Sequence, residues 1–134
     1  MFRRSPSRPG LGLRDGRLSP CGPTPNCVSS QAADPRHALA PLAFTGDPAS
    51  AFERLEQVLA RLPRTRIVAR TGDYLHAECA SRIFRFVDDL EFLLDGPSRI
   101  IHVRSASRVG YSDFGVNRRR VETIRRLFQW LQTG

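Results

Sequence analysis

Eight of the ten prolines lie within residues 1–48, and this uneven distribution is the strongest constraint on the fold. Proline fixes φ and removes a backbone donor, so a segment dense in proline cannot form a long helix or a central strand. We therefore expect most regular structure after this segment. The distribution predicts a basic, disordered leader over residues 1–17, an extended proline-rich arm over 18–48 and a single α+β domain over 49–134.

Amphipathic helices are predicted at both ends of the folded part. Asp47 followed by Pro48 is a favourable helix start, and apolar residues then recur at helical spacing until Pro63. A second helical pattern runs from about Asn117 to Gln132. Each helix has one apolar face that another layer must cover.

Four strand-like segments lie between the two helices, near residues 65–71, 74–82, 85–95 and 99–108. Short turns separate these segments, which favours antiparallel neighbours. The order α-β-β-β-β-α therefore predicts an α+β fold. We expect a four-stranded antiparallel meander flanked by two helices on one face, preceded by the proline-rich N-terminal arm.

The last two strands predict their own pairing on the apolar face. A tight turn at residues 96–97 would place Phe92 opposite Ile101. Leu90 would then lie opposite Val103, and both pairs would face the core.

The same register predicts a polar face on the other side of these strands. Glu91 would lie opposite His102, and Asp89 opposite Arg104. Cross-strand charge pairs of this kind contribute roughly 0.2–1 kcal/mol each. Asp88 has the parity of the apolar face, so it would point into the core unless a bulge redirects it.

All 21 cationic side chains are arginine, and the formal net charge is +8. The absence of lysine excludes a lysine nucleophile, a Schiff base and a P-loop lysine. A pI of 11.1 permits attraction to anionic small molecules or polyanionic surfaces. A genome that favours arginine codons is the preferred explanation of this composition. Nucleic acid is the least favoured partner, because few aromatic residues are interleaved with the arginines.

No segment approaches the ~20 apolar residues of a membrane span, and the first 20 residues lack the apolar stretch of a secretory signal. The sequence as written predicts a soluble, cytoplasmic protein, with an envelope location as the alternative if the true start lies upstream. Cys21 and Cys27 could form a disulfide in an oxidising compartment and would be reduced in the cytosol.

Three consecutive arginines at residues 118–120 stand at the predicted start of a helix, where the macrodipole favours negative charge. One interpretation is that a bound anion compensates them, held by backbone amides and forked arginine donors. The alternative is pairing with acidic residues of the chain itself. The candidate ligand-binding residues are Arg104, Arg108, Tyr111, Ser112, Asp113, Asn117, Arg118 and Arg119.

Acidic and imidazole side chains on the sheet offer a second hypothesis, a hydrolase in which one group acts as general base. Its candidate catalytic residues are Asp88, Asp89, Glu91, His76 and His102. No spacing matches a zinc or calcium signature, so neither a metal nor a cofactor is predicted. The preferred interpretation is a non-catalytic binding or scaffold domain that recognises an anionic ligand or surface.

Three long segments carry a resemblance to a known family. They are LGLRDGRLSPCGPTPNCVSSQA at residues 11–32, YLHAECASRIFRFVDDLEFLLDG at 74–96 and IIHVRSASRVGYSDFGVNRRRVETIR at 100–125. In this order they resemble a bacterial and plastid group, the domain of unknown function DUF1499, over about residues 9–128. The resemblance implies a compact α+β domain of unknown activity, often found in envelope or plastid-associated proteins behind a signal or membrane segment. It carries no established catalytic residues.

Overall fold

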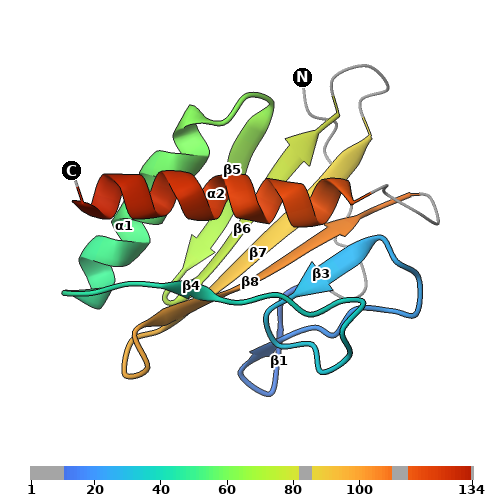
Figure 1. Ribbon diagram of the computed structural model, residues 1–134, viewed down its shortest axis with the longest axis horizontal. Helices are drawn as coiled ribbons and strands as arrows, with labels where there is room; N and C mark the ends of the chain where they lie inside the picture. Colours follow the sequence, from blue (N-terminus) through green and yellow to red (C-terminus); the bar gives the residue numbers. More distant parts are fainter. Residues whose placement is uncertain (1–10, 82–85, 110–114, 134) are drawn as a thin grey trace.

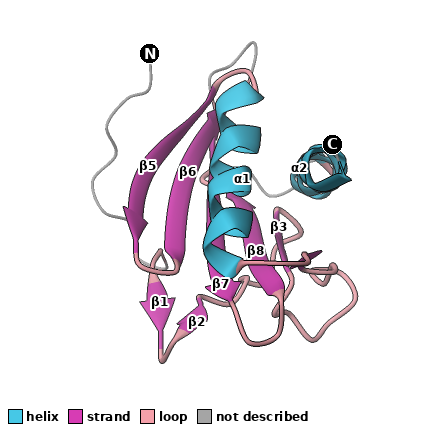
Figure 2. Cartoon of the chain, turned by 90° about the vertical axis from the view of Figure 1, so that its left-hand side faces the viewer, coloured by secondary structure: helices cyan, strands magenta, loops and turns pink. Residues whose placement is uncertain are grey.

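The computed structural model describes residues 11–81, 86–109 and 115–133, which form two layers (Figure 1). One layer is a six-stranded, mostly antiparallel sheet. The other contains α1 (Pro48–Arg61) and α2 (Val116–Thr133), which lie on the same face of the sheet (Figure 2). The predicted α+β class and both predicted helices are confirmed.

The centre of the sheet is the predicted meander of four consecutive antiparallel strands, β5 (Thr65–Thr71), β6 (Tyr74–Ala80), β7 (Val87–Asp95) and β8 (Ile100–Ser107). The prediction that the sheet ends there is wrong. Two pieces of the proline-rich arm, β3 (Cys27–Ser29) and β4 (Leu42–Ala43), pair with the outer edge of β8. Strands of two or three residues are too short to show a period in the sequence, and only pairing with β8 defines them.

The N-terminal part of the described chain forms a separate hairpin of β1 (Leu13–Arg14) and β2 (Arg17–Leu18). Its two turn residues, Asp15 and Gly16, have φ angles of 52° and 73°. Positive φ at both central positions defines the type I′ turn, which Asp-Gly favours. The predicted leader boundary at residue 17 therefore falls inside a hairpin, while residues 1–10 of that leader lie outside the described residues.

The predicted register of β7 and β8 is wrong by two residues. Phe92 pairs with Val103, not with Ile101, and Asp95 pairs with Ile100 across a four-residue loop. A two-residue I′ turn needs positive φ at both positions, whereas Pro97 fixes its φ near −65°. The chain instead places the positive φ at Arg99, at 57°. Because the shift is an even number, every side chain keeps its predicted face.

The core lies between the helices and the inner face of the sheet. Asp47 caps α1 as predicted, since its side chain accepts a 2.9 Å hydrogen bond from the Ser50 backbone N–H. Three phenylalanines are fully buried between the two layers: Phe52 of α1, Phe92 of β7 and Phe128 of α2. Within the described residues, neither helix offers the long apolar stretch that crossing a bilayer requires.

Candidate functional site

A buried charge network covers the polar face of the sheet, on the side away from the helices. Asp89 lies at its centre and accepts hydrogen bonds from Arg108 Nε at 2.8 Å and from His76 Nε2 at 2.8 Å. Arg108 also bridges to Glu78, and the Glu78 and Asp89 side chains are only 5% and 3% exposed. Burial raises the pKa of Asp89, but the hydrogen bonds from Arg108 and His76 outweigh it and lower the pKa to about 2. The same contact with Asp89 raises the pKa of Arg108.

Glu91 extends this network toward the N-terminal part of the chain. Its side chain is fully buried and accepts hydrogen bonds from Tyr74 Oη at 2.5 Å, the Gly12 backbone N–H at 2.8 Å and Arg104 Nη1 at 3.2 Å. Burial first, and then the hydrogen bond to Glu91, raises the pKa of Tyr74. Glu91 therefore connects the sheet to the segment that leads into the β1–β2 hairpin.

His76, Glu78 and Asp89 have the composition of a metal site, because their candidate ligand atoms lie within 4.8 Å of one another. Arg108 Nη2 already contacts both carboxylates, however. A divalent cation would have to displace this guanidinium, so the geometry fits an arginine better than a metal.

The structure brings together only part of the hydrolase candidate set. His76 and Asp89 contact each other, and Glu91 pairs with His76 across β6 and β7. Asp88 points to the opposite, helix-facing side, as its parity predicts, and forms a 2.7 Å ion pair with Arg120. His102 lies opposite Leu93 of β7, and its Nδ1 is 3.2 Å from Ser30 Oγ.

A second polar cluster lies beneath the start of α2. Asn117 is fully buried, accepts a 2.5 Å hydrogen bond from Ser105 Oγ and donates to Ser107 Oγ at 2.9 Å. Arg120 Nη1 donates to Asn117 Oδ1 at 2.9 Å, which links the cluster to Asp88. The Arg120–Asp88 pair agrees with the alternative interpretation of the arginine run, pairing within the chain, whereas sequence reasoning did not anticipate the two serines. The sequence does contain a signal for the two serines, because both occupy strand positions whose side chains point toward the helices.

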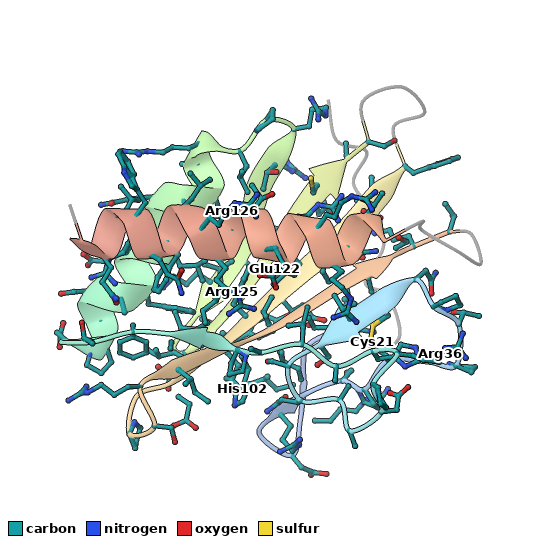
Figure 3. All side chains as sticks on the ribbon, viewed as in Figure 1. Cys21, Arg36, His102, Glu122, Arg125 and Arg126 are labelled. Atoms are coloured by element: carbon teal, nitrogen blue, oxygen red, sulfur yellow. A yellow bond between two sulfur atoms is a disulfide. The ribbon has the colours of Figure 1, made fainter. Side chains whose placement is uncertain are left out.

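Arginines of α2 also hold the arm in place. Arg118 donates to the carbonyl oxygens of residues 38 and 36 at 2.8 and 3.2 Å. Arg125 donates to the carbonyl oxygens of residues 41 and 40, both at 2.7 Å. Figure 3 shows Arg125 on the side of α2 that faces this segment, with Arg126 on the other side. The arm is therefore joined to the domain by side-chain donors as well as by β3 and β4.

The remaining predicted ligand-binding residues do not converge on one place. Tyr111, Ser112 and Asp113 lie outside the described residues. Arg119 is exposed on α2, while Arg104 and Arg108 are engaged by carboxylates of the polar face. The donors at the start of α2 are thus largely used within the chain.

The β1–β2 hairpin presents a different arrangement of arginines. Arg14 and Arg17 are direct cross-strand neighbours, and both are exposed. In residues 11–81, 86–109 and 115–133, no carboxylate forms an ion pair with either of them. Both line a cavity of about 490 Å³ that also includes Ser29 and Gln31. The sequence predicted a disordered leader for these residues and therefore did not predict a pair of arginines beside a cavity.

Arg17 and Gln31 also line a second cavity of about 450 Å³, at the end of the sheet where the β5–β6 and β7–β8 turns lie. This cavity includes His102, Asp73 and Asp95. Burial lowers the pKa of His102, and the charge of Arg17 adds to this effect while Asp95 opposes it. Burial therefore favours the neutral imidazole over the charged form, beside charges of both signs.

The arm carries the predicted cysteine pair. Cys21 and Cys27 form a disulfide with a sulfur separation of 2.07 Å, and Cys79 is a buried free thiol. The bridge connects the segment after the hairpin to β3.

Fold and site together define a two-layer α+β domain with an arginine–carboxylate network on its polar face and an N-terminal arm built into its sheet. A family model described as a protein of unknown function, DUF1499, matches residues 17–128. The chain therefore belongs to the DUF1499 family, as its resemblance predicted. Among curated proteins, no match to this chain was found.

Proposed function

We propose that this domain is a non-catalytic binding module that recognises an anionic group at the β1–β2 hairpin. The observation that carries the proposal is the pair Arg14 and Arg17, two like charges placed directly opposite each other beside a cavity. Like charges in this position are unfavourable. A bound carboxylate or phosphate would offset the repulsion and match the forked donors of both guanidinium groups.

The charge network argues against the hydrolase alternative. A general base needs a pKa near the working pH and free access to the proton that it removes. Asp89 has a pKa of about 2 and is only 3% exposed, and its oxygens accept hydrogen bonds from Arg108 and His76. This arrangement supports a structural role for the network.

The contacts at the start of α2 also support the hairpin as the anion site. Arg118 donates to backbone carbonyl groups and Asn117 to Ser107, so their donors have acceptors within the chain. The charge-bearing donors of Arg14 and Arg17 have no such carboxylate partner among the described residues. Asp15, at the hairpin tip, is the acidic residue nearest in sequence to both arginines.

Isothermal titration of the purified protein with inorganic phosphate and with citrate tests this proposal. The double variant Arg14→Gln/Arg17→Gln should lose at least about tenfold in affinity, because charge-assisted hydrogen bonds to both arginines are removed. The control Arg61→Gln/Arg126→Gln removes the same charge from exposed positions on α1 and α2 and should bind as the wild type does.

Asp15→Asn gives an independent check, since removing the negative charge at the hairpin tip should tighten binding. Equal losses in both double variants would mean that the anions respond only to net charge. That result, or the absence of saturable binding by either anion, would refute the proposed site.

A further inference from the structure

We infer that the ligand of this site is a small zwitterion, with its carboxylate at Arg17 and its protonated amine between Asp73 and Asp95. The inference rests on the proposed anion site and specifies its ligand. The second cavity shares Arg17 and Gln31 with the first and has a volume of about 450 Å³. Small-molecule sites are typically about 300–1,000 Å³, so an amino acid fits this space.

Two aspartates form the acidic side of the cavity. Asp73 lies in the turn between β5 and β6, and its carbonyl oxygen accepts a 2.8 Å hydrogen bond from the Leu94 backbone N–H. Asp95 ends β7, and its Oδ1 accepts a 3.2 Å hydrogen bond from the Ser98 backbone N–H. In the described parts of the chain neither carboxylate forms an ion pair. Backbone contacts therefore hold two uncompensated acids at one end of the sheet.

The hairpin brings the opposite charge to this end. Figure 2 shows β1 and β2 at the same end of the sheet as the turn that joins β5 to β6. Arg17 lines the same cavity as Asp73 and Asp95, without contacting either at ion-pair distance. Charges of both signs thus face one space and remain unpaired with each other. A ligand that carries both charges can satisfy all three side chains.

His102 adds an imidazole to the lining of the cavity. Ser30 Oγ accepts a 2.9 Å hydrogen bond from the Val103 backbone N–H and lies 3.2 Å from His102 Nδ1, to which its hydroxyl can donate. In the tautomer that accepts this hydrogen bond, the ring proton is on Nε2. This nitrogen can donate to a ligand carboxylate alongside Arg17 without adding a positive charge that would repel the amine.

Ligands of a single charge fit this cavity less well. A simple carboxylate would bind Arg17 but remain near Asp73 and Asp95, and a simple amine would bind the aspartates but remain near Arg17. Repulsion of this kind discriminates between ligands as strongly as new attractive contacts do.

Titration with matched pairs tests the inference: L-alanine, L-leucine and L-glutamate against propionate, 4-methylpentanoate and glutarate, which lack only the amino group. We expect at least one amino acid to bind about tenfold more tightly than its partner. Asp73→Asn changes a side chain with no hydrogen bond among those described. It should remove the preference for the amino acid over its partner and leave carboxylate binding intact. Glu53→Gln, an exposed charge change on α1, should leave it unaltered.

The outcomes separate the inference from the proposed function on which it rests. Equal affinity for the two members of every pair would refute the zwitterion while leaving the anion site in place. Binding of the amino acids that survives Arg17→Gln would refute the zwitterion at this cavity, because the carboxylate would then bind elsewhere, while phosphate and citrate binding in Arg14→Gln/Arg17→Gln separately tests the anion site. Asp95→Asn supplies a second acidic variant, which should behave as Asp73→Asn does.

Discussion

Arg108 joins two buried carboxylates, and its replacement by glutamine should destabilise the fold more than the loss of any surface arginine. The side chains of Arg108, Glu78 and Asp89 are 10%, 5% and 3% exposed, so water cannot replace the lost contacts. Breaking a buried ion pair costs about 3–5 kcal/mol, because a charge is left without compensation. We therefore expect the free energy of unfolding to fall by about 3–5 kcal/mol at pH 7, a large share of the about 5–15 kcal/mol typical of a domain.

The pH dependence of the free energy of unfolding distinguishes loss of charge compensation from simple loss of packing. In the wild type the folded pKa of Asp89 lies near 2, below its ordinary 3.8, so ionised Asp89 stabilises the fold above about pH 4. In Arg108→Gln, the acidic groups of Glu78 and Asp89 remain within 4.8 Å without the cation. Their repulsion and burial should raise the pKa of Asp89 above its ordinary value. A raised pKa favours the fold at low pH, so the deficit relative to wild type should shrink from pH 7 to pH 4.

Urea unfolding followed by circular dichroism at pH 7, 5.5 and 4 measures both effects. Arg66→Gln is the matched control, because Arg66 also pairs with Glu78 but its side chain is 48% exposed. Exposed pairs contribute about 0–1 kcal/mol, so this variant should remain close to wild type. If Arg108→Gln does not fold at pH 7, the double variant Arg108→Gln/Glu78→Gln removes one uncompensated charge and should restore folding. Equal losses in the Arg66 and Arg108 variants, or a deficit that does not change with pH, would refute the reasoning.

Three further predictions follow from other contacts. Thiol titration of the unfolded protein should find one reactive thiol before reduction and three after it. Replacing both Cys21 and Cys27 by serine should lower the free energy of unfolding by about 2 kcal/mol, since the loop that the disulfide closes is short. Between pH 4 and pH 2 the free energy of unfolding of the wild type should fall by about 2 kcal/mol more than that of Asp89→Asn, because only the wild type has this carboxylate of lowered pKa to protonate. An equal fall in both proteins, measured by urea unfolding, would contradict this. Arg118→Gln should speed amide hydrogen exchange around residues 36–38 about tenfold without changing global stability, and unchanged exchange would show that the arm is held by other contacts.

The element order and the faces of the strands could be predicted from local pattern. Helical spacing after Asp47 and alternation along β6, β7 and β8 specify which side chains face the core, and the structure agrees for residues such as Leu75 and Phe92. These features depend only on the period of each element and on its nearest neighbours in the chain. An error of two residues in register left them unaltered, because a strand repeats every two residues.

The functional interpretation depended on partners that local pattern does not contain. The run of arginines at residues 118–120 left open an anion site or pairing within the chain, and the structure shows Arg118 at backbone carbonyl groups of the arm and Arg120 at Asp88. Arg14 and Arg17, in contrast, seemed part of a disordered leader and instead line two cavities. A long cationic side chain can reach any acceptor within several ångströms, and the sequence does not state which one lies there.

The sequence by itself determined the fold class, the two helices, the central meander and the separation of an apolar from a polar sheet face, since each follows from local spacing and side-chain chemistry. Only the tertiary structure decided that the arm completes the sheet, that Arg108 compensates Glu78 and Asp89, and that Arg17, Asp73 and Asp95 line one cavity without an ion pair among the described residues. The physical reason is that pairing of charges depends on distances between segments far apart in the chain. Folding sets those distances largely through packing of the core, which brings together side chains that are not neighbours in the sequence.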